Sequence, residues 1–114
     1  MRRGKNVKFS RENTQRQALY KSLATALIDH GKIKTTLVKA KSLSSFADKL
    51  ITTAKKQDLT ARRELARTFH SKTVNKLVDE LAPRFNDKKG GYTRVIRLGQ
   101  RKSDGAEMAI IEWV

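Results

Sequence analysis

Two segments rich in β-branched and aromatic residues lie close together in the last quarter of the chain. The first is Tyr92–Leu98, which follows two glycines, and the second is Met108–Val114. The stretch between them contains the pair Asp104–Gly105. Two such segments joined through an Asp-Gly turn predict a β-hairpin. Since the chain before it has mostly helical periodicity, we expect the hairpin to form the sheet against which the helices pack.

Four helices are predicted before the hairpin, because apolar residues repeat there at helical spacing. Thr14 and Gln17 have the spacing of a capping box at the start of the first helix, and Gly31 supplies its stop. Pro83 is expected to end the fourth helix, since the residue before proline avoids helical geometry. A short strand is predicted at Lys32–Thr36. The predicted helices cover residues 14–30, 37–55, 59–70 and 71–82.

The predicted order of elements is α-β-α-α-α-β-β, which is typical of the α+β class. We expect two layers, with the helices packed on a small three-stranded mixed sheet. Met108–Val114 carries apolar residues on both faces, so it is expected to be the central strand. A length of 114 residues is that of one domain. We therefore predict a single globular domain at residues 13–114, after a basic N-terminal arm at residues 1–12.

The predicted arm has no useful periodicity, and its five cations face only Glu12. A segment with so much like charge repels itself and is expected to be extended. Basic arms of this kind often become ordered along nucleic-acid grooves. A frayed terminus without a function is the alternative.

The charge of the whole chain indicates a polyanionic partner. Twenty-six Lys and Arg residues oppose eleven Asp and Glu residues, which gives a net charge of +15. Nucleic acid is the first candidate, because phosphate neutralisation gives affinity without base reading. An anionic membrane surface is the second, and a merely soluble basic protein is the alternative to both. Without cysteine, a long apolar run or a signal-peptide core, the chain is expected to be soluble and intracellular.

Side chains suited to catalysis are few. His30 and His70 each lie at the end of a predicted helix, and neither belongs to a metal-binding motif. Gly90–Gly91 lacks the Lys-Ser/Thr of a phosphate-binding loop and precedes a strand. We expect no enzyme, and neither a metal, a cofactor nor a small-molecule substrate.

The basic residues fall into three groups, whereas the acids concentrate in the helical middle of the chain. Segregated charge of this kind favours a docking surface. Nothing resembles a helix-turn-helix, zinc-finger or RNP motif, so recognition through phosphate and shape is expected. The candidate RNA-binding residues are Arg2, Arg3, Lys5, Lys8, Arg11 and Arg16 in the first group, Lys32, Lys34, Lys39 and Lys41 in the second, and Arg84, Lys88, Lys89, Tyr92, Arg94, Arg97, Arg101 and Lys102 in the third.

Five blocks of sequence occur in an order that points to a known family. They are Arg16-Gln17-Ala18, Ile33–Leu37 followed by Lys39-Ala40-Lys41, Pro83-Arg84-Phe85, Gly90–Arg94 and Asp104–Ala109. With them the chain resembles the bacterial large-subunit ribosomal protein seventeen family over essentially its whole length. Two departures are Arg3, where the family commonly has histidine, and Ser103, where a glycine commonly precedes the aspartate.

The resemblance implies a structural constituent of the large ribosomal subunit in the cytoplasm. It implies binding to large-subunit ribosomal RNA near the nascent-peptide exit region, beside neighbouring large-subunit ribosomal proteins. It also implies helices over a small mixed sheet. The alternative from another class is a non-specific polyanion-binding protein, acting on DNA or on a membrane surface.

Overall fold

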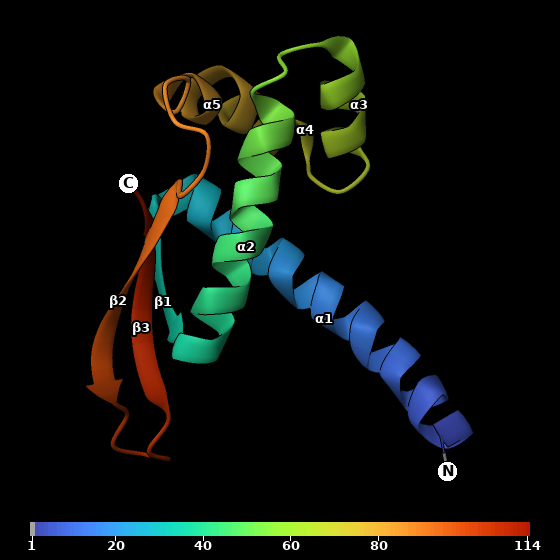
Figure 1. The fold of residues 1–114 in the computed structure, drawn as a ribbon, viewed down its shortest axis with the longest axis vertical. Helices are drawn as coiled ribbons and strands as arrows, with labels where there is room; N and C mark the ends of the chain where they lie inside the picture. The colour runs from blue at the N-terminus through green and yellow to red at the C-terminus, as the bar shows by residue number, and fades with distance from the viewer. Residues whose placement is uncertain (1) are drawn as a thin grey trace.

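Three strands form one small sheet that helices cover on one side (Figure 1). The computed structural model describes residues 2–114, and the side chains from Gln15 onward. The strands are β1 (Lys32–Thr36), β2 (Thr93–Gln100) and β3 (Glu107–Trp113), in the order β1-β3-β2. The predicted hairpin, the short first strand and the central position of the last strand are therefore confirmed. So is the α+β class.

The sheet is antiparallel throughout, and the prediction of a mixed sheet is wrong. The reason is the central position of β3. Strands β1 and β2 run in the same direction, but each of them pairs with β3, which runs the opposite way. The register is interrupted between Arg97 and Gly99, where a bulge brings in an extra residue of β2.

Helix α1 (Arg2–His30) is longer than predicted, because it includes the segment expected to form an extended arm. The predicted helix start at Thr14 is therefore wrong. A helix already nucleated in its C-terminal half can continue through residues without proline at little further cost. In Figure 1 the N-terminal part of α1 projects away from the body. The helix stops where predicted, at Gly31, which has φ +83° and donates its N–H to the Leu27 carbonyl (2.8 Å).

Helix α2 (Leu37–Ala54) lies across the sheet and contributes the largest share of the core. It begins directly after β1, with the Thr36 hydroxyl accepting from the backbone N–H of Lys39 (3.4 Å). The predicted separation between the second and third helices, before residue 59, is confirmed. Gln57 has φ 59°, and Asp58 caps α3 (Leu59–Ala66) by accepting from the Ala61 N–H (2.7 Å).

The predicted fourth helix is one continuous run of three pieces: α4 (Ser71–Lys76), the π-helical turn η1 (Leu77–Leu81) and α5 (Ala82–Arg84). His70 occupies its N-cap position. Pro83 lies inside the last piece, so the prediction that it ends the run is wrong. Proline is tolerated in the first turn of a helix. Pro83 occupies such a position, because it is the second residue of α5, which follows the wider π-helical turn η1.

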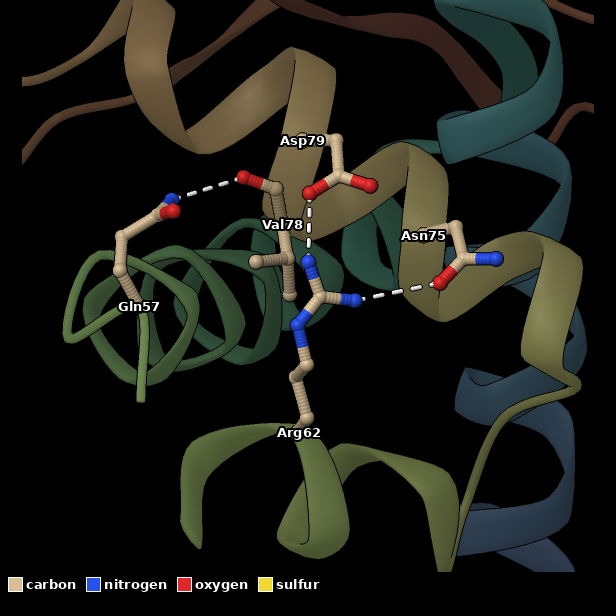
Figure 2. Close-up of polar contacts among 5 residues, drawn as sticks. All are labelled: Gln57, Arg62, Asn75, Val78 and Asp79. Carbon is tan, nitrogen blue, oxygen red and sulfur yellow. Dashed lines mark hydrogen bonds and ion pairs between the residues drawn. The ribbon is translucent and has the colours of Figure 1, made fainter. Parts of the chain in front are cut away.

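Arg62 and Gln57 connect α3 and its preceding turn to this run (Figure 2). The Arg62 guanidinium donates to Asn75 Oδ1 (3.2 Å) and to Asp79 Oδ1 (2.5 Å). Gln57 Nε2 donates to the Val78 carbonyl, which lies within the π-helical turn (2.7 Å). These side-chain contacts link α3 and its preceding turn to the helical run.

The core lies between the sheet and the helices. Its fully buried members come from α1, α2, η1 and β3, and include Leu27, Leu43, Ile51, Leu77 and Ile111. The Trp113 indole closes it by donating a hydrogen bond to the Leu27 carbonyl (3.0 Å). On β3 only the face of Ala109, Ile111 and Trp113 is buried, while Met108 and Ile110 are half-exposed. The helices thus cover one face of the sheet.

Candidate nucleic-acid interface

Two of the sequence-separated basic groups meet at one end of the sheet. The end of β1 lies beside the start of β3, as the pairing of Thr36 with Met108 shows, and α2 begins at the same place. Figure 1 shows the hairpin turn and the start of α2 at this end of the molecule. We call this region the sheet-end surface; its exposed basic residues are Lys39, Lys41, Arg97, Arg101 and Lys102. Lys34 is exposed but pairs with Ile110, so it lies with Lys32 on the uncovered face of the sheet, whereas Arg97 pairs with the buried Ala109 on the other face.

The start of α2 adds a further positive potential to the sheet-end surface. The first turn of this helix contains no acidic residue, so its N-terminal dipole is not compensated from within the helix. Lys39 and Lys41 add two full charges within its first five residues. An anion at this position is favoured by both contributions.

The third predicted group is divided by the fold. Arg84 is the last residue of α5, and Lys88 and Lys89 lie in the connection between α5 and β2, at the opposite end of the sheet from the hairpin turn (Figure 1). Arg84 packs over the Phe85 ring, with 5.5 Å between the guanidinium carbon and the ring centroid. These three residues are exposed but do not join the sheet-end surface.

Two of the candidate arginines are paired with carboxylates. Arg94 Nε donates to Glu112 Oε1 (2.7 Å), on the exposed face of the sheet, where Lys32 lies across β3 from Arg94. Arg101 donates two hydrogen bonds to Asp104, of 3.0 and 2.6 Å. Each pairing neutralises part of the charge that the sequence places at the hairpin.

The Arg101–Asp104 pair shifts the ionisation of both groups. The hydrogen bonds from Arg101 and then from the Ala106 N–H lower the pKa of Asp104 from 3.8 to about 2. The hydrogen bond to Asp104 raises the pKa of Arg101 above its ordinary value. Both side chains are exposed, so the pair links two residues of the turn but contributes little to the stability of the fold.

Tyr92 is buried, which removes it from the predicted RNA-binding set. Its side chain is 1% exposed and packs on Phe85, with 5.3 Å between ring centroids. Its hydroxyl accepts from Lys55 Nζ (3.2 Å) and donates to the Lys88 carbonyl (3.2 Å). The sequence prediction is wrong here because a tyrosine at the entry of a strand can turn its ring inward, under the loop that precedes it.

The first basic group lies on α1. Arg16 is exposed, on the part of the helix that is described with side chains. The side chains of Arg2, Arg3, Lys5, Lys8 and Arg11 lie outside the described residues. Their assignment to RNA stays a prediction.

The structure also brings together two cations that the sequence gives no reason to pair. Lys21 of α1 and Arg67, just after α3, line the same two cavities together with Thr68. Phe46 of α2 lines one of them. The sequence does not predict that Lys21 and Arg67 lie close together, because they are far apart in the chain and no motif contains both of them.

Membrane-spanning and metal-binding features are both absent from the part of the chain that the structure describes. No helix there has the length and apolarity needed to cross a bilayer. No group of three or more His, Cys, Asp or Glu side chains among these residues is arranged to hold a metal ion.

Comparison with known proteins gives one family. The profile described as "Ribosomal protein L17" matches residues 19–114. A protein of Methylacidiphilum infernorum, named "Large ribosomal subunit protein bL17", is 51% identical over 107 residues, which cover 93% of this chain and 82% of the relative.

Two further relatives carry the same name. The protein of Symbiobacterium thermophilum is 49% identical over 111 residues, covering 96% of this chain and 98% of the relative. That of Thermus thermophilus is 49% identical over 109 residues, covering 94% and 92%. In both cases the similarity extends over nearly the full length of the two chains compared.

Proposed function

Because the chain belongs to the ribosomal protein L17 family, we propose that it binds large-subunit ribosomal RNA as a structural component of the bacterial large ribosomal subunit. Membership of this family makes the chain a ribosomal protein and not an enzyme. Its working place is then the ribosome in the cytoplasm. The location near the nascent-peptide exit region, which follows from the family resemblance, is part of the proposal.

The observation that carries the RNA-binding proposal is the sheet-end surface. Its cations come from α2 and the hairpin, and the fold is needed to bring them together. The acidic residues of this region are Asp104, which pairs with Arg101, and Glu107. Lys39, Lys41, Arg97 and Lys102 have no carboxylate within 4.0 Å among the described residues. Unpaired cations on a rigid frame suit phosphate groups of a folded RNA.

The mode of binding follows from the kind of residues present. The sheet-end surface offers lysine and arginine but no aromatic side chain. Such a surface contacts phosphates and matches shape, and it does not read base edges. Its RNA affinity should therefore fall steeply with salt.

Sedimentation through a sucrose gradient tests the function. Tagged protein in a bacterial lysate should co-migrate with the large subunit at one copy per particle and remain there after a moderate salt wash. A spread through free, DNA-bound or membrane fractions without fixed stoichiometry would overturn the proposal and support the non-specific polyanion binder instead.

A double variant tests the sheet-end surface itself. Replacing Lys39 and Lys41 with glutamine should weaken binding to protein-free large-subunit ribosomal RNA and reduce the salt slope by about 2, because two phosphates are no longer neutralised. Arg63→Gln with Lys72→Gln is the matched control, because both residues are exposed, belong to the helical layer and lie outside the surface. Equal loss of affinity in the two double variants would show that only total charge matters.

A further inference from the structure

A groove lies between the middle of α1 and the turn that follows α3. It consists of two adjoining cavities of about 370 and 510 Å³, which share Lys21, Arg67 and Thr68 in their walls. Cavities of this size are in the range of about 300–1,000 Å³ that small-molecule sites occupy. The groove is separate from the sheet-end surface, which is formed by other elements.

The walls of the groove favour an anion. Lys21 and Arg67 are exposed, and neither has a carboxylate within 4.0 Å among the described residues. The described side chains that line the two cavities include none from Asp or Glu. Arg62, five residues before Arg67, is by contrast paired with Asp79. In this region Arg62 is therefore paired with a carboxylate of the protein, whereas Arg67 lines the groove without one.

An aromatic ring lies in the wall of the larger cavity. Phe46 is half-buried, and its ring stacks on that of Tyr20 with 6.3 Å between centroids and 29° between planes. The same ring lines the cavity beside Arg67 and Lys21. Gln17 and Thr68, which also line this cavity, are residues with an amide and a hydroxyl. A flat apolar ring next to two cations is the combination that holds an unpaired base and its phosphate.

We propose that this groove binds one unpaired nucleotide of the RNA, with its base on Phe46 and its phosphate between Lys21 and Arg67. The inference rests on the proposed function, that the chain binds ribosomal RNA, and adds a contact of a different chemistry. At the sheet-end surface the RNA is held by its phosphates, whereas here a single base is held by stacking. The groove therefore selects a bulged or looped-out position over continuous duplex.

Substitutions that separate stacking from charge test the proposal. Phe46→Leu keeps an apolar side chain but removes the ring face, and Arg67→Gln and Lys21→Gln remove one charge each. Arg63→Gln is the matched control, since it removes one exposed charge from α3 outside the groove. Affinity for protein-free bacterial large-subunit ribosomal RNA is measured between low and moderate salt, and circular dichroism confirms that each variant is folded.

The expected results differ between the two kinds of contact. Phe46→Leu should lower affinity at least about fivefold with an unchanged salt slope, because base stacking does not release counterions. Arg67→Gln and Lys21→Gln should each reduce the salt slope by about 1. If Phe46→Leu fails to fold, the two exposed positions still decide between the groove and the control.

A photo-crosslinker at Thr68 identifies the occupant. In assembled large subunits it should capture an unpaired nucleotide; capture of a neighbouring ribosomal protein, or of a duplex segment, would overturn the proposal. Wild-type binding that is salt-sensitive, with the groove variants no weaker than Arg63→Gln, would also overturn it while the proposed function stands. Absence of RNA binding by the wild-type chain would instead remove the proposed function itself.

Discussion

The indole N–H of Trp113 lies 3.0 Å from the carbonyl oxygen of Leu27, and this hydrogen bond joins the end of β3 to the last turn of α1. The two residues are 86 positions apart in the sequence. The same carbonyl accepts the N–H of Gly31, which ends the helix. One backbone oxygen thus serves both the helix stop and the closure of the core.

Trp113→Phe should lower the free energy of unfolding by about 1–2 kcal/mol, from the lost hydrogen bond and the smaller ring. The Leu27 carbonyl keeps its bond to Gly31, so the cost stays below that of an unpaired buried group. Urea unfolding followed by circular dichroism measures it, with the exposed Leu98→Ala as control. A difference from wild type no larger than that of the control would show that the indole hydrogen bond does not hold α1 to the sheet.

Tyr92→Phe should cost about 1 kcal/mol of stability and leave RNA affinity unchanged. The hydroxyl joins Lys55 to the loop before β2, so its removal loosens that loop. Thermal unfolding and RNA titration of the same samples provide the two readouts. Weaker RNA binding at unchanged stability would return Tyr92 to the RNA interface and contradict its structural role.

The hairpin turn should respond to acid between about pH 4 and pH 2. The folded pKa of Asp104, about 2, is below its usual value of 3.8, so its contribution is present above about pH 4. That contribution is lost as the pH falls through about 2 and the carboxylate that pairs with Arg101 becomes protonated. An NMR titration of the Asp104 side chain measures the midpoint, and Asp104→Asn should abolish the associated shift of the Ala106 amide. A midpoint near 3.8 in the folded protein would mean that the pair does not persist in solution.

The Arg62–Asp79 ion pair should contribute little by itself, although it links α3 to the helical run (Figure 2). Its side chains are 36% and 56% exposed, and pairs of this kind contribute about 0.2–1 kcal/mol. A double-mutant cycle of Arg62→Ala and Asp79→Ala, at low and high salt, gives the coupling energy. The same cycle with Arg63 in place of Arg62 is the control and should give no coupling. A coupling above about 2 kcal/mol would indicate a desolvated pair instead of a surface contact.

The strands can be predicted from the sequence because their signals are local. β-branched residues and an Asp-Gly turn define the hairpin, and apolar residues on both faces of Met108–Val114 indicate its central position. The stop at Gly31 and the cap at the break before α3 are likewise properties of a few adjacent residues. Such features depend little on how the rest of the chain packs.

The remaining features depend on which segments meet in space. The start of α1 is not predictable from local pattern, because a strongly charged segment can continue an existing helix without any periodicity of its own. The pairing of Arg94 with Glu112 follows from strand register, and the inward ring of Tyr92 follows from the packing of its loop. Lys21 and Arg67 line the same cavity only because the fold places the segment that follows α3 beside α1. Charge alone indicates the class of partner but not the surfaces that face it.

The central position of β3 also sets the order in which the chain can become native. Strands β1 and β2 pair only with β3, so neither has an edge to bind until residues 107–113 have been synthesised. Until then α2 has only part of the surface on which it packs, and the basic chain has no folded sheet. Contacts between such distant parts of a sequence form slowly, because the entropy of closing a long loop is lost before the contacts stabilise the chain. For a chain with a net charge of +15, the time before the sheet closes is the period in which binding to a wrong polyanion has to be avoided.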